Sequence, residues 1–123
     1  MATLNNRVFD SGLSVLDTEA NKIVITSQEA TTFTNANATY ALGNSTSLSI
    51  AAPSDRSGGG REVVVAAITD GSVTATGTAT HYAIIDTTNS RLLATSTLSA
   101  SQAVTSGNTF TLASFTIGIP DPA

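Results

Sequence analysis

The sequence predicts an all-β protein: a single antiparallel β-sandwich, jelly-roll or Ig-like, of about seven or eight strands with a short N-terminal helix. Two observations predict this class. Short β-branched or alternating apolar segments recur along the chain, separated by turn residues at intervals of roughly 8–12 residues. Thr and Ser supply 36 of the 123 residues, and the branched Cβ of Thr suits the exposed face of a pleated strand. Because no repeat or linker interrupts this pattern, we expect residues 1–123 to form one domain.

The first segment, residues 1–20, is the only candidate for a helix and is interpreted as an N-terminal helix or arm. Its apolar residues recur mainly four positions apart, which fits one face of an amphipathic helix. Asn5 or Asn6 is a suitable N-cap, whereas Gly12 costs a helix about 1 kcal/mol relative to Ala. Residues 13–15 also alternate between apolar and polar, so a strand stays open as the alternative.

Two strands and a long loop are expected next. Residues 22–26 are β-branched and predict a strand, and residues 47–51 alternate as a half-buried strand does. Between them, residues 27–44 are polar and have no clear period, so we expect a loop that three larger side chains anchor to the core. These are Phe33, Tyr40 and Leu42.

The strongest break in the chain lies at residues 52–60, which we expect to form a flexible Gly-rich loop. Its three consecutive glycines do not make a phosphate-binding P-loop, because Arg61 follows them where that motif requires Lys. Arg56 and Arg61 flank the glycines. Besides a purely structural loop, the sequence allows a contact in which these two arginines pair with an acidic patch on a neighbouring subunit.

The second half of the chain begins with a buried segment. Residues 61–68 predict a central strand, because three consecutive valines are apolar on both faces. Asp-Gly at residues 70–71 is a tight-turn signal. Residues 72–80 alternate Thr with small residues and predict an edge or solvent-facing strand, and residues 81–85 predict a core strand.

The remaining residues predict a hairpin and one long strand. A hairpin loop is expected at residues 86–90, with a return strand over residues 91–98. After a Gly-Asn turn at residues 107–108, the last strand covers residues 109–119. Its apolar residues change parity near residues 113–114, which predicts a β-bulge or a strand that bends between two sheets.

Composition excludes several classes of protein. The net charge is −4 at pH 7 and only five residues are Lys or Arg, so the chain lacks the basic face of a nucleic-acid-binding protein. With no cysteine, it has no disulfide, no Cys-ligated zinc and no thiol nucleophile. No apolar run approaches the roughly 18–20 residues of a membrane helix, and the N-terminus lacks the apolar region of a signal peptide.

No combination of residues indicates catalysis or metal binding. His81 is the only histidine, and it lies within a predicted strand with no accompanying Ser or Asp motif. No Ser occupies a Gly-x-Ser-x-Gly elbow. Asp17 and Glu19 are two positions apart, so they do not share a helix face as a carboxylate pair would. We therefore expect a protein that is not an enzyme, with no cofactor and no metal.

Four stretches carry a resemblance to a known class of proteins. They are ITDGSVTATGTATHYA at residues 68–83, DTTNSRLL at 86–93, SQAVTSGNTF at 101–110 and LNNRVFD at 4–10. In these stretches the chain resembles small structural proteins encoded by tailed bacteriophages and prophages. Any acidic, Thr-rich β-domain shares this composition, which leaves a chance likeness as the alternative.

The resemblance implies a virion component that is assembled in the cytoplasm of a host bacterium. Within that class it favours a capsid decoration (cement) protein, homo-oligomeric and bound to the major capsid protein or other virion proteins, with no nucleic acid or membrane as partner. A tail, baseplate or fibre-associated module, structural or receptor-binding, is the alternative. The resemblance transfers no functional residues, so Arg56 and Arg61 are the only site residues that the sequence proposes.

Overall fold

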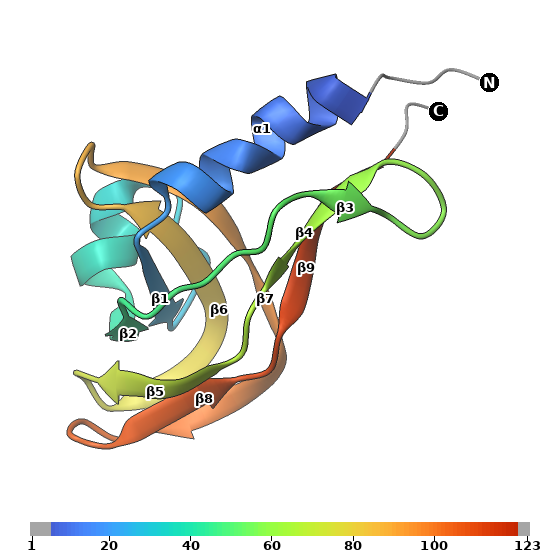
Figure 1. Ribbon diagram of the computed structural model, residues 1–123. Helices are drawn as coiled ribbons and strands as arrows, with labels where there is room; N and C mark the ends of the chain where they lie inside the picture. Colours follow the sequence, from blue (N-terminus) through green and yellow to red (C-terminus); the bar gives the residue numbers. More distant parts are fainter. Residues whose placement is uncertain (1–5, 121–123) are drawn as a thin grey trace. The chain divides into compact units, whose positions relative to one another are not determined.

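The computed structural model describes the backbone of residues 6–120 and the side chains of residues 11–120. The chain divides into two compact units, which we describe separately. Among the described residues, the first unit contains 6–19, 49–67 and 113–120, and the second contains 20–48 and 68–112. Each unit has an antiparallel sheet of its own (Figure 1).

The predicted all-β class is confirmed, because the described chain is mostly strand, with two antiparallel sheets and one N-terminal α-helix. The described residues form nine strands rather than seven or eight. One of them has only two residues, and the single last strand predicted over residues 109–119 is divided into two strands. The strands are β1 (Lys22–Thr26), β2 (Ala41–Ser45), β3 (Ser54–Asp55), β4 (Arg61–Val65), β5 (Ile68–Val73), β6 (Gly77–Asp86), β7 (Arg91–Val104), β8 (Thr109–Leu112) and β9 (Phe115–Ile119).

The second unit contains a six-stranded sheet with the order β7-β6-β1-β2-β5-β8. Its central strand β1 is buried on both faces: Val24 is paired with Ala83 on one face, and Ile23 with Ile84 on the other. Consecutive strand residues point to opposite faces, so both faces of this sheet must be covered. The largest fully buried side chains of the sheet are its isoleucines, Ile23, Ile25, Ile84 and Ile85, in a chain with only four Phe, two Tyr and no Trp.

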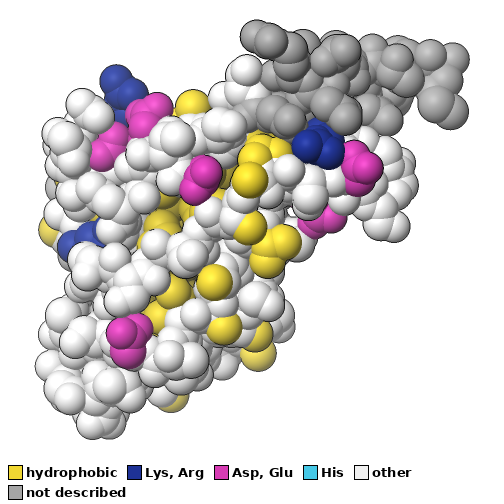
Figure 2. All heavy atoms as spheres, in the orientation of Figure 1, with side chains coloured by type: hydrophobic (Ala, Val, Ile, Leu, Met, Phe, Trp, Pro, Cys, Tyr) yellow, Lys and Arg dark blue, Asp and Glu magenta, His cyan; other side chains and the backbone are white. Residues whose placement is uncertain are grey.

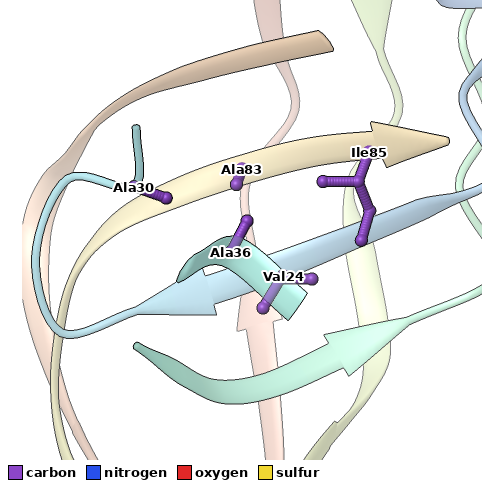
Figure 3. Packing of buried hydrophobic residues seen from close by; sticks show 5 residues of the cluster. All are labelled: Val24, Ala30, Ala36, Ala83 and Ile85. Carbon is purple, nitrogen blue, oxygen red and sulfur yellow. The ribbon is translucent and has the colours of Figure 1, made fainter. Parts of the chain in front are cut away.

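One face of this sheet is covered by the segment that the sequence predicts as a loop. The segment contains a short π-helix, η1 (Asn35–Thr39), and it ends in β2. Ala36 of η1 packs with Val24 of β1, with Ala83 and Ile85 of β6, and with Ala30 of the same segment (Figure 3). Lys22 Nζ donates a hydrogen bond to Asn37 Oδ1 at 3.1 Å, which ties η1 to β1. The predicted anchors are confirmed: Phe33 and Tyr40 pack on this cluster, and Leu42 is buried.

Thr26, at the end of β1, is fully buried and its hydroxyl has no hydrogen-bond partner among the described residues. Burying a hydroxyl without a partner costs about 1–3 kcal/mol. We therefore expect Thr26→Val to raise the free energy of unfolding by about 1 kcal/mol in urea denaturation. Thr95→Val is the control, because the Thr95 hydroxyl donates to the Tyr82 carbonyl oxygen at 2.9 Å, and its loss should destabilise. A destabilised Thr26→Val protein would contradict this account.

Three sequence predictions about strand limits are wrong. The Asp-Gly pair at residues 70–71 lies inside β5 instead of forming a turn, because Gly71 is opposite Phe110 of β8 and leaves space for its ring. The predicted strand at residues 47–51 is reduced to a single bridge between Ile50 and Val65. The predicted strand at residues 72–80 is also divided, since β5 ends at Val73 and β6 begins at Gly77.

β6 and β7 form the predicted hairpin, seen as two long curved neighbouring strands in Figure 1. β7 continues to residue 104 rather than ending near 98. The turn between them is organised by Asp86, which is buried and accepts backbone N–H bonds from Thr88 and Asn89 and a side-chain bond from Asn89 at 2.8 Å. A buried carboxylate with several donors holds the hairpin in one register.

Asp86 predicts a pH dependence of stability. The Asn89 amide, then the backbone N–H groups of Thr88 and Asn89 and the charge of Arg91, hold the pKa of Asp86 below its ordinary value, although burial opposes them. A lowered pKa in the folded state means stabilisation that is complete above the unfolded pKa and is lost as the pH falls through the folded pKa. We expect Asp86→Asn to lower the urea midpoint of unfolding at pH 7, and the difference in midpoint between the variant and wild type to become smaller towards pH 3. A difference in midpoint that does not change with pH would contradict this role of the Asp86 carboxylate.

The first unit contains α1 (Asn6–Glu19) and a three-stranded sheet with the order β3-β4-β9. The helix, rather than the alternative strand, is formed over most of residues 1–20; the predicted caps at Asn5 and Asn6 lie outside the described side chains. α1 packs against β4, and among its described side chains, those of residues 11–19, Leu13 and Leu16 are buried. β4 lies between β3 and β9, as predicted for a central strand, but it ends at Val65 rather than at residue 68. It is buried on one face only, since Val63 and Val65 are fully buried whereas Val64 is 40% exposed.

The apolar positions of the predicted last strand change from even-numbered to odd-numbered residues near 113–114, and the reason is that its two halves belong to different sheets. β8 is an edge strand of the six-stranded sheet, whereas β9 is in the three-stranded sheet. The predicted strand that bends between two sheets is therefore confirmed. Each half keeps its own alternation, because each faces a different core.

Candidate assembly surface

The Gly-rich loop is held by hydrogen bonds within itself. Gly58, Gly59 and Gly60 all have positive φ angles between +88° and +106°, which L side chains adopt at a cost. The Arg56 N–H donates to the Gly60 carbonyl, and the Gly59 N–H donates to the Arg56 carbonyl, both at 3.1 Å. The glycines therefore allow a tight reversal between β3 and β4.

Arg61 lies at the start of β4 and is bound to the opposite side of the loop. Its Nη1 forms an ion pair with Asp55 Oδ1 at 2.7 Å, and its Nη2 donates to the Pro53 carbonyl at 3.2 Å. The Arg61 side chain is 17% exposed and that of Asp55 is 88% exposed. Such a solvent-facing pair contributes about 1 kcal/mol or less, so the contacts of Arg61 chiefly orient its guanidinium.

Arg56 extends across the sheet to β9. Its Nη1 donates to the Gly59 carbonyl at 3.1 Å, and its Cδ would lie 2.9 Å from a Cβ built on Gly118. Gly118 is paired with Glu62 of β4, so Arg56 and Glu62 lie on the same face of the three-stranded sheet. The structure therefore does not bring the two predicted arginines together. Arg61 begins β4 beside Asp55, whereas Arg56 lies in the loop after β3 with its side chain above Gly118, on the opposite face of the sheet.

The pairing of these arginines with a neighbouring subunit stays a prediction. If Arg56 contacts an acidic patch there, Arg56→Ala should weaken association about fivefold, as expected for the loss of one exposed ion pair of about 1 kcal/mol. Association can be measured by sedimentation over a range of concentrations. Arg56→Lys is the control that keeps the charge, and the thermal unfolding midpoint shows whether the loop itself is disturbed. Unchanged association of Arg56→Ala would remove the proposed contact.

His81, the other residue that the sequence singled out, is held by its neighbour on β6. Its Nδ1 lies 2.8 Å from the Thr80 hydroxyl, which donates its proton to the Ser27 carbonyl at 3.0 Å. The hydroxyl oxygen is then left to accept, so Nδ1 carries the ring proton. The contacts of His81 with Thr80 fit a histidine whose polar atoms are satisfied on a sheet face.

The neighbouring Tyr82 is buried. Burial raises the pKa of its hydroxyl, and a hydrogen bond with Ser96 opposes that rise.

The acidic side chains do not form a metal site in the described part of the chain. Among residues 11–120, no three or more His, Asp or Glu side chains are grouped closely enough to hold a metal ion. Asp17 is exposed on α1. Glu19 is two positions further along the same helix, a spacing at which two side chains do not share a helix face. No described helix has the length and apolar character to cross a membrane.

A second surface was not identified from the sequence. β7 is an edge strand of the six-stranded sheet, and Arg91 is the only charged residue among its fourteen. Its other exposed positions are all small: Ser96, Thr97, Ser99, Ala100, Ser101 and Ala103. Figure 2 shows the same sparse charge over the face in view, where most surface is neither charged nor hydrophobic. The Thr/Ser/Ala pattern was visible in the sequence, but the edge position follows from strand order.

No protein-family model, curated protein or solved structure matches the chain. Its function is therefore argued from its own residues and surfaces.

Proposed function

We propose that the protein is a non-enzymatic structural component of a tailed-bacteriophage virion, a capsid decoration protein that binds the major capsid protein and stabilises the head. The observation that carries this proposal is strand β7, which has no charged residue after Arg91 and whose exposed positions after Arg91 are all small: Ser96, Thr97, Ser99, Ala100, Ser101 and Ala103. The sequence resemblance to phage structural proteins supports the same class.

The physical reason is the side-chain entropy that is lost when a surface is buried in an interface. Ser, Thr and Ala lose little side-chain entropy when an interface orders them, whereas Lys, Glu and Gln lose about 1.5–2 kcal/mol each. The cores of protein interfaces are also depleted of charged residues. A surface of this kind suits repeated contact with neighbouring subunits, and decoration of a capsid requires such contacts in many copies.

Imaging of intact particles tests the location. The proposal expects many copies spread over the head shell, and proteinaceous density for this chain against the major capsid protein. A few copies confined to the tail would overturn the decoration role and would favour a tail, baseplate or fibre module. Absence of the protein from purified particles would overturn the virion assignment altogether.

A binding experiment tests the surface. Purified protein is added to capsids that lack it, and Ser99→Lys on β7 is compared with Thr69→Lys, an exposed position on β5 of the same sheet. Both changes add one positive charge. We expect Ser99→Lys to bind capsids at least about tenfold more weakly, since a buried unpaired charge is costly, and Thr69→Lys to bind as wild type. Equal binding of the two variants would exclude β7 as the contact surface.

A further inference from the structure

The described sheets end in four edge strands, and three of them carry features that hinder pairing with another chain. β3 has only two residues. β7 has two register shifts against β6. In β8, the Thr111 carbonyl already accepts a hydrogen bond from the Gln102 side chain at 3.0 Å. Short strands, bulges and covered edges are the devices by which proteins prevent edge-to-edge association.

The fourth edge strand, β9, has none of these devices within the part of the chain that the structure describes. Its five residues pair with β4 in an unbroken register, and residues 113–120 contain no charge. Phe115 and Ile117 are half-buried and Ile119 is 36% exposed, whereas Val63 and Val65 on the neighbouring strand are fully buried. An uncharged, regular and apolar edge strand is a template for another strand.

We propose that β9 pairs with β9 of a second copy of this chain, antiparallel across a twofold axis at Ile117. We infer that the partner strand belongs to a second copy of this chain because the residues of β9 are complementary to those of an identical antiparallel strand. In this register Ile117 lies opposite itself, Phe115 opposite Ile119 and Thr116 opposite Gly118. The three apolar residues share one face of the sheet, since their β4 partners include the buried Val63 and Val65. The pairing therefore continues that face across the axis.

Charge supports a second copy rather than a charged peptide. The paired segments themselves contain no ionisable side chain, so no like charges lie directly opposite each other along β9. The nearest charge is that of Arg56, whose side chain lies above Gly118 on the face opposite to the three apolar residues. A slip of one residue would place the apolar face of one copy against the Thr116 and Gly118 face of the other. The result is a six-stranded intersubunit sheet with the order β3-β4-β9-β9-β4-β3, an isologous contact of the type that closes a dimer.

Cysteine cross-linking tests the contact, because the native chain has no cysteine. Directly opposite residues of antiparallel strands have Cβ atoms about 4.5–5.5 Å apart, close to disulfide geometry. We expect Ile117→Cys to form a covalent dimer under mild oxidation at least about tenfold faster than Val64→Cys. Val64 is the matched control, since it is 40% exposed on the adjacent strand but points to the opposite face. Equal rates for the two variants would overturn the pairing.

Sedimentation of the purified full chain gives an independent readout. Wild type should show a dimer in the micromolar range, and Ile117→Lys should raise the dissociation constant at least about tenfold by placing two like charges opposite each other. If Ile117→Lys does not fold by circular dichroism, the more exposed Ile119→Lys replaces it. A wild-type monomer throughout this range overturns the inference. No capsid is present in either experiment, so their outcome is separate from that of the virion proposal.

Discussion

Gly60→Ala should be among the most destabilising single substitutions in this protein, lowering the free energy of unfolding by about 3 kcal/mol. Two costs combine. Gly60 has a φ of +93°, and a non-glycine residue in that region costs about 1–3 kcal/mol. A Cβ at this position would also overlap the Ile119 carbonyl oxygen and lie 2.8 Å from Pro120 Cα. Both neighbours are backbone atoms, so the overlap is relieved only by moving β9 away from β4.

Gly107→Ala is the matched control for this prediction. Gly107 has nearly the same φ, +91°, but a Cβ there would meet no atom within 4 Å. Its substitution should therefore cost only the backbone strain, about 1 kcal/mol. Chemical denaturation of both variants measures the difference. If the two variants lose the same free energy of unfolding, the close approach of the Ile119 and Pro120 backbone to Gly60 does not contribute to the destabilisation, and the prediction is wrong.

Phe110→Ala should cost about 3–5 kcal/mol, the usual loss for removing a buried aromatic ring. Phe110 is 3% exposed, and its ring occupies the space above Gly71, where a Cβ would overlap three of its atoms. The ring also lies 3.2 Å from a Cβ built on Gly43. An aromatic side chain over strand glycines replaces the contacts that those glycines lack.

The same geometry predicts a coupling between Gly71 and Phe110. Gly71→Ala alone should cost about 1–3 kcal/mol, because the new methyl group displaces the ring. In the Phe110→Ala background the methyl group enters the vacated space, so Gly71→Ala should be nearly neutral there. A double-mutant cycle measures this coupling energy. Additive effects would show that the ring and Gly71 do not share the space as described.

The sequence predicted elements well where local pattern and burial agree. The strand at residues 22–26 and the hairpin at residues 86–90 were found because β-branched residues and turn residues act locally. The Asp-Gly pair at residues 70–71 failed because the glycine serves a distant neighbour, Phe110, which lies thirty-nine positions further along the chain. The long loop at residues 27–44 contains η1 and β2, whose formation depends on packing against β1.

The candidate site was predicted in part. The run of three glycines indicated Arg56 and Arg61, and the structure places Arg61 at the start of β4 and Arg56 in the loop before it, with the two side chains on opposite faces of the three-stranded sheet. Their individual contacts, Arg61 with Asp55 and Arg56 above Gly118, could not be predicted, because they depend on which strands are neighbours. The contrast between β9 and the other edges is likewise invisible in sequence, since an edge is defined by the absence of a partner strand.

The low charge, the absence of cysteine and the abundance of Thr and Ser are properties that the sequence by itself determined. They exclude thiol chemistry, predict that the chain does not bind nucleic acid, and favour strands, because they depend on side-chain chemistry alone. Only the tertiary structure decided the strand order, the two separate sheets and the exposed edges. The reason is that strand pairing joins residues far apart in the chain, and many pairings satisfy the same alternation until the whole core is packed.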